Sequence, residues 1–288
     1  KDIALMNSEE LIENYKLLGI SHNIELMHRL GTERMFGNTL EAARSEKKWN
    51  NIRAYLNIFD EYFTYLNGSQ KIHLLHFLYE LLMHREGDIR RSAAELAGNI
   101  VARFDQGYHK ELPQDVPPDN GPRALDVWKQ YIDMVINPDH KLTAQHKSWI
   151  GYTLKLTASS LLEHCKPEEQ ADYMRAFLPY FSADDYEQKE RLTVFVLLDT
   201  IEDLPLTLYT AEELGLLYRF AVRAAGCDSF ELKAAALRVL HCLTGMAGPP
   251  LLAEIRGFVE QFDDQGNTSF VFLKGRLLTA LKLDCCRQ

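Results

Sequence analysis

Three histidines and a glutamate in the stretch HLLHFLYELLMH have the residue types and spacing of a metal-binding helix. His73, His76, Glu80 and His84 follow one another at intervals of three, four and four residues, so a helix would place them along one stripe. Pairs of His and Glu side chains at this spacing bind zinc or iron. The stripe extends over roughly 16 Å, so one ion could contact only two adjacent members. The leucines occupy the opposite side, which favours the stripe as the solvated outer face of a helix.

Other catalytic and metal-binding patterns are missing from the sequence. It contains no HExxH, no GxSxG, no glycine-rich phosphate loop and no His-Glu dipeptide. The five cysteines include no CxxC pair; they are Cys165, Cys227, Cys242, Cys285 and Cys286. An odd number of scattered cysteines indicates free thiols in a reducing compartment. We therefore expect a non-catalytic, cytoplasmic protein with neither a cofactor nor a bound metal.

Composition and charge exclude several classes of protein. A hydrophobic share of 46% with 25% charged residues is typical of a folded chain. The formal net charge of -9 argues against generic binding to nucleic acid or to anionic lipid, which needs a surplus of Lys and Arg. The first residues, KDIALMNSEELIENYKLLG, have no export leader, and no apolar run is long enough to span a membrane. Because the chain begins with Lys1, we expect it to be a fragment or a processed form of something larger.

The elements that would position any site are helices. Alternating β-branched runs are missing, and apolar residues recur at helical spacing through most of the chain. In GDIRRSAAELAGNI, Gly87 is suited to end one helix and Asp88 to cap the next. Ile89, Leu96 and Ile100 then fall on one apolar face with small alanines between them. The sequence predicts an all-α protein.

Pairs of helices recur along the chain. Second helices are predicted to start near Ser182 or Asp185, at Ser229 and at Thr268, and a longer copy reads KLTAQHKSWIGYTLKLTASSLLEHC. Each follows another amphipathic helix, and Thr210 with Glu213 forms a capping box at one of these. The spacing gives a period of roughly 40 residues, which is in the range of two-helix solenoid repeats.

These pairs resemble HEAT repeats, whose second helix opens with Asp, an aliphatic residue and Arg before an alanine-rich face. GDIRRSAAELAGNI matches this pattern closely, DSFELKAAALRVL matches in its alanines and leucines, and the other copies match in period. The resemblance covers residues 70 to 284. It implies a right-handed α-α superhelix of about five HEAT-like two-helix repeats, and it identifies fold rather than function.

Two regions depart from the repeat. The first is residues 1–68, which we predict to form a helical N-terminal segment or cap. The repeat array itself is predicted to comprise residues 69–288. A long proline-rich loop at 105–122 interrupts the array, because its prolines cannot continue a helix. Loops of this length are either functional or mobile.

The second helices carry more basic than acidic residues, although the whole chain has 32 Lys and Arg against 41 Asp and Glu. In HEAT-like arrays these helices line the concave face, so the resemblance implies a mildly basic groove. The expected contacts there are Arg90, Arg91, Lys147, Lys189, Lys233, Lys274 and Arg276, with Tyr108, His109 and Lys110 in the loop. The alternative is an internal ladder in which acids pair with arginines of the same or the next repeat, as Asp88 could with Arg91. The aromatics Trp149, Tyr152, Phe195 and Phe270 are interface anchors if exposed and core residues otherwise.

The function that fits these patterns is a protein-interaction scaffold or regulatory module. It would use its concave face to bind a protein partner or an acidic peptide segment. A second hypothesis is that the chain is the helical-repeat region of a larger enzyme whose catalytic domain lies outside it. A third is metal-dependent chemistry through the His73, His76, Glu80 and His84 stripe, and nucleic-acid binding is a minor fourth.

Overall fold

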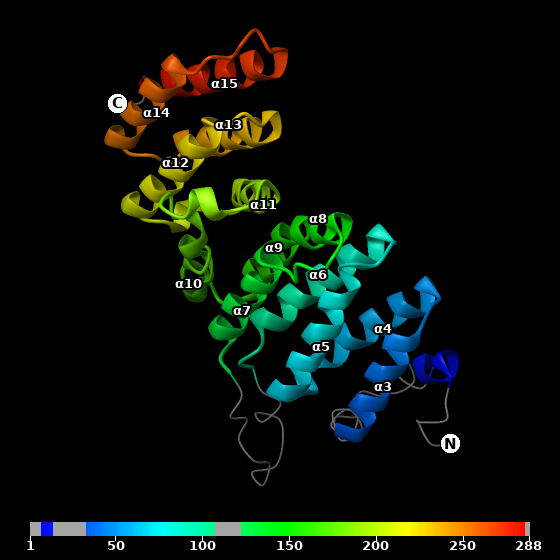
Figure 1. Cartoon of the computed structure of the whole chain (residues 1–288). Coiled ribbons are helices and arrows are strands. Elements are labelled where there is room, and N and C mark those ends of the chain that lie inside the picture. The colour runs from blue at the N-terminus through cyan, green and yellow to red at the C-terminus, as the bar shows by residue number, and fades with distance from the viewer. Residues whose placement is uncertain (1–6, 14–32, 107–121, 286–288) are drawn as a thin grey trace. The chain divides into compact units, whose positions relative to one another are not determined.

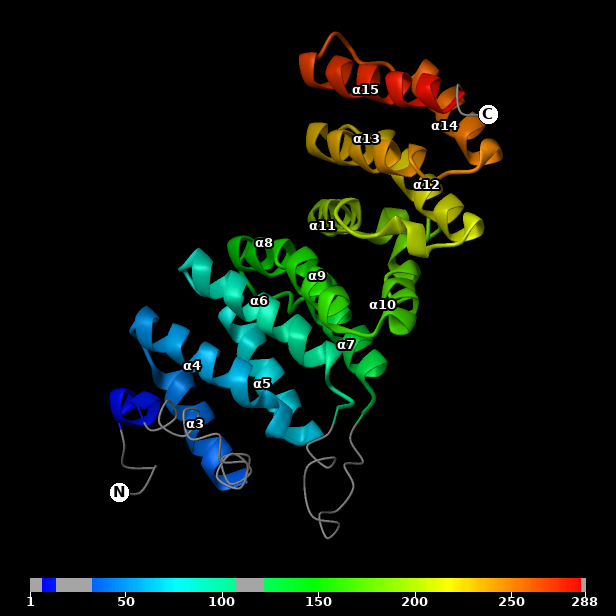
Figure 2. The ribbon, with the colours of Figure 1, turned by 180° about the vertical axis from the view of Figure 1, so that it is seen from behind.

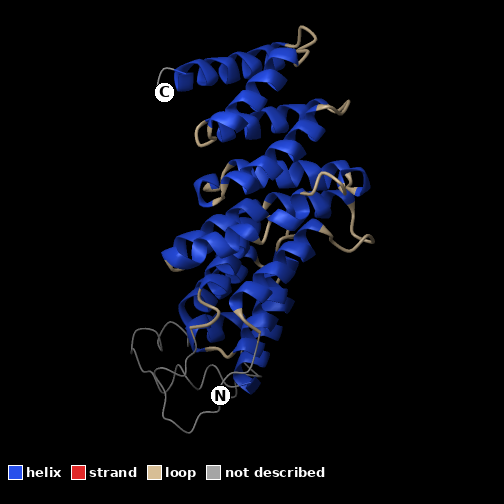
Figure 3. Cartoon of the chain, turned by 90° about the vertical axis from the view of Figure 1, so that its left-hand side faces the viewer, coloured by secondary structure: helices blue, strands red, loops and turns tan. Residues whose placement is uncertain are grey.

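The computed structural model describes residues 7–13, 33–106 and 122–285. Every regular element in these ranges is helical, and none of their residues forms a strand (Figure 3). No helix in these ranges combines the length and the apolar character needed to cross a bilayer. The predicted all-α fold class is confirmed.

The chain forms two compact units. Unit 1 comprises Lys1–Tyr131 and Lys141–Lys166, and unit 2 comprises Ile132–His140 and Pro167–Gln288. Helix α7 (Ala124–Ile136) contributes residues to both. This division falls inside the region that the sequence predicts as one repeat array.

Unit 1 is built from helix pairs that stack in rows. Its other elements are α3 (Glu33–Ser45), α4 (Trp49–Tyr62), η2 (Phe63–Tyr65), α5 (Gly68–Leu81), α6 (Gly87–Ala102), α8 (Ala144–Tyr152) and α9 (Leu154–His164). The first helices pack on each other, α3 on α5. The second helices form a second row in which α6 lies between α4 and α9 (Figures 1 and 2). The predicted N-terminal segment therefore contains a pair, α3 and α4, that packs as a repeat does.

Unit 2 repeats this pattern. Its elements are η4 (Pro167–Glu169), α10 (Gln170–Arg175), η5 (Leu178–Phe181), η6 (Tyr186–Gln188), α11 (Arg191–Glu202), η7 (Leu206–Leu208), α12 (Ala211–Ala225), α13 (Phe230–Thr244), α14 (Pro249–Gln261) and α15 (Thr268–Cys285). Helix α12 packs on α14, and α13 packs on both α11 and α15. Since first helices contact first helices and second helices contact second helices in each unit, the helical-repeat architecture is confirmed.

Local sequence signals fix several helix starts. The Thr210 hydroxyl accepts a hydrogen bond from the backbone N–H of Glu213 at 3.2 Å. In return, the Glu213 carboxylate accepts a hydrogen bond from the backbone N–H of Thr210 at 2.8 Å. This is the predicted capping box at the start of α12. Asn67 and Gln70 form the same box before α5, and Ser229 caps α13. Such caps satisfy backbone N–H groups that lack a partner inside the helix.

Three predicted helix boundaries were wrong. Helix α6 begins at Gly87 with Glu86 as its extended N-cap, so Asp88 lies in the first turn and does not cap it. Helix α11 begins only at Arg191, because Lys189 and Glu190 have extended backbones. The long copy from residue 141 is split into α8 and α9 at Thr153. There both the N–H and the hydroxyl of Thr153 donate to Ile150 O, which interrupts the regular pattern.

A glycine sets the separation of α6 and α9. A Cβ atom on Gly98 would lie 2.3 Å from Thr157 O and 2.9 Å from Leu161 N, closer than real Cβ atoms come to backbone. The Ser160 hydroxyl donates to Glu95 O at 2.6 Å across the same contact. The small residues of the GDIRRSAAELAGNI stretch therefore allow close helix packing, as the sequence predicts.

A buried lysine holds the end of α6. Lys71 is 1% exposed, and its ammonium group donates to the carbonyls of Phe104 and Gln106 at 3.1 and 3.2 Å. It also lies 3.5 Å from Arg103 O. These carbonyls follow the last turn of α6, where the helix dipole favours a cation. The hydrogen bonds compensate for burying the charge.

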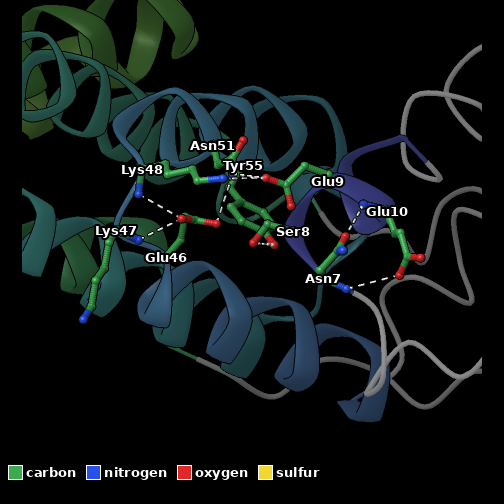
Figure 4. A network of polar contacts seen from close by, with 9 residues as sticks. All are labelled: Asn7, Ser8, Glu9, Glu10, Glu46, Lys47, Lys48, Asn51 and Tyr55. Carbon is green, nitrogen blue, oxygen red and sulfur yellow. Dashed lines mark hydrogen bonds and ion pairs between the residues drawn. The ribbon is translucent and has the colours of Figure 1, made fainter.

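Polar contacts join residues 7–13 to the turn between α3 and α4 (Figure 4). The Tyr55 hydroxyl donates to Ser8 Oγ at 2.9 Å, and Lys48 and Asn51 donate to Glu9. Glu46 accepts the backbone N–H groups of Lys47 and Lys48. Hydrogen bonds from its own backbone, Asn51 and Lys48 lower the pKa of Glu9. The network fixes this N-terminal segment onto unit 1.

Ion pairs link successive repeats at a nearly constant sequence separation. In unit 1, Arg44 on α3 pairs with Glu80 on α5 at 3.0 Å, 36 residues apart. The pairs in unit 2 have separations of 36 to 38 residues; they are Arg175 with Glu213, Arg223 with Glu187, Arg191 with Asp228, and Arg238 with Glu202. The predicted ladder therefore exists between repeats. Its acids are mostly glutamates, and no ion pair joins Asp88 to Arg91 within the described residues.

Candidate functional site

The histidine stripe is an exposed surface for most of its length. His73, His76 and Glu80 are exposed on α5, and Glu80 accepts a hydrogen bond from Arg44. The prediction that all four residues share one helix was wrong for His84, because α5 ends at Leu81. His84 lies in the following turn, where its Nδ1 accepts the N–H of Glu86 at 3.0 Å. In the part of the chain that the structure describes, no three His, Cys, Asp or Glu side chains are grouped to hold a metal ion.

Arg90 is engaged within unit 1. Its guanidinium donates to His84 O at 2.6 Å and to Arg85 O at 3.0 Å, and it lies 4.2 Å from the centre of the Trp149 ring. The two carbonyls belong to the turn between α5 and α6, and the Trp149 ring belongs to α8. By contacting all three, the guanidinium of Arg90 holds this turn against α8. Arg90 therefore acts as a structural clamp.

The other predicted basic contacts have varied surroundings. Lys274 donates to Phe262 O at 2.7 Å. Lys233 and Arg276 lie over the rings of Phe270 and Phe272. Arg91 is exposed, Lys147 is half-buried, and Lys189 lines a cavity in unit 2. The loop residues Tyr108, His109 and Lys110 lie outside the described residues.

The sequence left open whether four aromatic residues belong to the core or are exposed. Of these, Phe270 is a core residue at 3% exposure, whereas Tyr152 is 45% exposed. Trp149 and Phe195 are half-buried. The exposed large apolar side chains of the described residues also include Phe272, at 63% exposure. Of these four aromatics, Tyr152 is therefore the exposed one.

A groove in unit 1 gathers polar side chains from three second helices. It encloses about 350 Å³ between α4, α6 and α9. Its lining is Leu56, Asn57, Asp60, Ser92, Glu95, Leu96, Asn99, Leu156, Ser159, Ser160, Glu163 and His164. On α6 these positions recur at i, i+3, i+4 and i+7, which is one face of a helix. The row of second helices therefore presents a continuous polar face here.

The charges in the groove are unbalanced. Asp60, Glu95 and Glu163 contribute three carboxylates, and the lining contains no Lys or Arg. None of the three forms an ion pair among the described residues. His164 Nδ1 lies 2.8 Å from Ser160 O, so this nitrogen carries the proton and Nε2 is the acceptor in the neutral ring. This groove differs from the mildly basic one that the sequence led us to expect.

Asn99 is the last of the four α6 residues that line the groove. Its amide nitrogen donates to Asp60 Oδ1 at 3.0 Å. Among the described residues its Oδ1 has no hydrogen-bond partner, and this atom has no appreciable exposed surface. A buried acceptor without a donor costs about 1–3 kcal/mol, so the groove contains an unsatisfied polar atom.

Unit 2 has a cavity of about 500 Å³ near the starts of α11 and α13. Its charged lining residues are Glu187, Lys189, Arg191, Arg223 and Asp228. Arg191 binds Asp228 at 2.6 Å, and Arg223 binds Glu187. Here the carboxylates already have cationic partners from the neighbouring repeat, in contrast to the groove of unit 1.

One pair of contacts makes this difference explicit. In unit 2, Glu202 on α11 accepts a hydrogen bond from Arg238 on α13 at 3.1 Å, 36 residues away. In unit 1, Asp60 on α4 accepts one from Asn99 on α6, 39 residues away. Both bonds join one second helix to the next. The neutral amide of Asn99 leaves the charge of Asp60 uncompensated.

Sequence reasoning missed the groove because it selected residues by positive charge. The signal was present as a polar stripe on one face of each second helix, for example Ser92, Glu95 and Asn99, or Ser159 and Glu163. A stripe of this kind reads as an ordinary solvated face. Only the packing of α4 and α9 on α6 turns three such stripes into one concavity.

No model of a protein family matches the sequence, and no curated protein matches it significantly. Among solved structures, a designed armadillo repeat protein aligns over 84% of this chain and 98% of its own, at 10% identity and a TM-score of 0.40. An engineered protein aligns over 86% of this chain and 98% of its own, at 11% identity and a TM-score of 0.41. At fold level, the packing of its own helices defines this chain as a helical-repeat protein.

Proposed function

We propose that this chain is a non-catalytic protein-interaction module that binds a segment of a partner protein in the groove of unit 1. The observation that carries the proposal is the convergence of hydrogen-bonding side chains from three successive second helices on one concave surface. Helical arrays present extended surfaces of this kind to other chains.

The construction of the groove supports binding without large rearrangement. Leu56 and Leu96 are buried beneath it, and Ser160 is tied to Glu95 O across the contact between α6 and α9. Side chains placed on packed helices lose little further conformational entropy when a ligand binds. A polar rim over an apolar floor is the usual composition of a recognition site.

The basic contacts predicted from the sequence remain a separate prediction. Arg91 and Lys147 are the members on unit 1 with exposed surface and no internal partner among the described residues. They would bind an acidic segment, as the sequence suggests.

The alternative that the chain is part of a larger enzyme also stays a prediction, as does a cytoplasmic location. Among the described residues, Cys165, Cys227 and Cys242 form no disulfide.

Site-specific photo-crosslinking in extract from the source cells tests the proposal. A benzophenone side chain replaces Ser159 in the groove wall, where the serine is exposed. We expect adducts with one partner, and peptide mapping should place the crosslinks within one continuous segment of it. Irradiation after adding excess unlabelled chain should reduce the yield.

The matched control places the same side chain at Ser69, an exposed serine on α5 outside the groove. Circular dichroism of both variants checks that the helices are retained. Equal adducts from both positions, or scattered adducts from Ser159, would contradict binding in the groove. Adducts from a third probe at Arg91 alone would transfer the binding role to the basic surface.

A further inference from the structure

The charge of the unit 1 groove restricts what can bind there. Among the described lining residues its three carboxylates meet no Lys or Arg, and Asp60 accepts a hydrogen bond from the neutral amide of Asn99. Arg53 and Arg91 lie on the same helices but do not line the groove. An acidic segment would place like charges together, whereas a basic one would complete ion pairs.

The three carboxylates of the groove are dispersed and are not grouped as the ligands of one ion. Among the residues that the structure describes, no three acidic, His or Cys side chains are close enough to hold one metal ion. The acids instead come from three different helices, one each from α4, α6 and α9. Such dispersed charges match a ligand that carries several separate cationic groups.

The unsatisfied atom of Asn99 points to the same chemistry. Asn99 is one of the lining residues; among the described residues its Oδ1 is a buried acceptor without a hydrogen-bond partner, while its amide nitrogen donates to Asp60. Lys and Arg side chains carry only donors, so they satisfy acceptors of this kind without adding new unpaired ones. This observation is independent of the charge balance.

The apolar floor favours long side chains over a compact cation. Leu56, Leu96 and Leu156 are among the lining residues, and Leu56 and Leu96 are buried. Lys and Arg bury their methylene stems against apolar surface while their charged ends reach polar groups. A basic peptide segment therefore fits both layers of the groove.

We propose that the occupant of the groove is a basic segment of a partner protein, with Lys or Arg side chains directed to Asp60, Glu95 and Glu163. The proposal rests on the proposed function and names the chemistry of the partner.

Fluorescence anisotropy with defined peptides tests it on the whole chain. The probe is a labelled peptide of alternating Lys and Ser, and the comparison peptide carries Glu in place of each Lys. The groove variant combines Asp60→Asn, Glu95→Gln and Glu163→Gln. The control combines Glu212→Gln, Glu231→Gln and Glu254→Gln, three exposed acids of unit 2. Both variants change the net charge equally, so general attraction to an acidic protein is matched.

We expect the groove variant to bind the Lys peptide about tenfold more weakly than the parent, and the control to change by less than about threefold. An equal loss in both variants would overturn the proposal, because it would show attraction to the net charge alone. Tighter binding of the Glu peptide would overturn it as well.

Asn99→Arg provides a second route to the same answer without removing any carboxylate. The new guanidinium would pair with Asp60, as Arg238 does with Glu202 in unit 2, and would exclude the Lys peptide. A loss of about tenfold is expected, and unchanged affinity with a folded protein would contradict the proposal.

The two proposals fail in different ways. If crosslinks from Ser159 map to one segment that is acidic or neutral, the groove binds a partner but the basic assignment is wrong. If the Lys peptide binds selectively but the probe at Ser159 yields no crosslinked partner, the preference of the groove for basic peptides is supported. The proposal that the groove binds a partner protein is then contradicted.

Discussion

In unit 2, the carboxylates beside the cavity pair with arginines 36 or 37 residues away in a neighbouring repeat, whereas the carboxylates of the unit 1 groove form no ion pair among the described residues. Both regions are concavities between successive helices, and both are bridged by contacts at nearly the repeat period. The difference is the residue opposite the acid. Beside the unit 2 cavity, Arg223 faces Glu187 and Arg191 faces Asp228, whereas Asn99 faces Asp60 in the unit 1 groove. The same scaffold can thus neutralise its own charge or leave it for a ligand.

The position of unit 1's buried cation adds to this contrast. Lys71 is directed to carbonyls at the end of α6 and not to the groove. In unit 2 the cations Arg175 and Arg238 lie against glutamates. Burial raises the pKa of Glu213, but hydrogen bonds from Thr210 and Arg175 outweigh it, and the net pKa is lowered.

The largest effect should come from breaking the helix contact beneath the groove. Gly98→Ala places a methyl group against the backbone of α9, so α6 and α9 must separate. We expect a loss of about 3 kcal/mol in the free energy of unfolding, measured by urea denaturation. Gly275→Ala on α15 is the control, since no atom lies within 4 Å of its Cβ position. That change should stabilise by up to about 1 kcal/mol, and equal losses at both sites would refute the special closeness of α6 and α9.

The next effect tests the buried cation of unit 1. Lys71→Met keeps the length of the side chain but removes the donor to Phe104 O and Gln106 O. We expect a loss of about 2 kcal/mol, because charged hydrogen bonds are lost and carbonyls are left unpaired. The matched change in unit 2, Lys233→Met, removes only a contact of 6.0 Å with the Phe270 ring and should cost less than about 1 kcal/mol. A stability of Lys71→Met equal to the parent would mean that the lysine does not hold the end of α6.

The smallest effect measures the ladder that distinguishes unit 2. A double-mutant cycle with Glu202→Gln and Arg238→Met should give a coupling energy of about 0.5–1 kcal/mol, since both side chains are mostly shielded at 23% and 33% exposure. The same cycle on Arg191 and Asp228 should give a value near zero, because these side chains are 69% and 83% exposed. Thermal or urea unfolding supplies the energies. A larger coupling energy for Arg191 and Asp228 than for Glu202 and Arg238 would mean that shielding from solvent does not control the strength of these ion pairs.

Much of the fold could be predicted from the sequence because its signals are local. The apolar spacing of α6 and α13, the capping box of Thr210 with Glu213 and the cap at Ser229 each involve residues within a few positions. Alanine and glycine at the α6 face likewise predicted close packing. These features depend on helix geometry and need no knowledge of distant residues.

The boundaries that failed involve competition between nearly equal local structures. Thr153 interrupts α8 and α9 through a hydroxyl bond to Ile150 O, and Lys189 with Glu190 adopts extended backbone before α11. Either segment is compatible with a longer helix by composition alone. Helix propensity does not decide between the two conformations, because the differences in propensity among such residues are small.

The sequence by itself determined that the chain folds into paired amphipathic helices with a period near 40 residues, because that information is written in short-range periodicity and caps. Only the tertiary structure decided which charges meet. Asp60 and Asn99, or Glu202 and Arg238, lie in contact although dozens of residues separate them, and the partner is set by the register of one helix against the next. The acidic groove exists for the same reason, since three polar stripes on three helices become one surface only when α6 packs between α4 and α9.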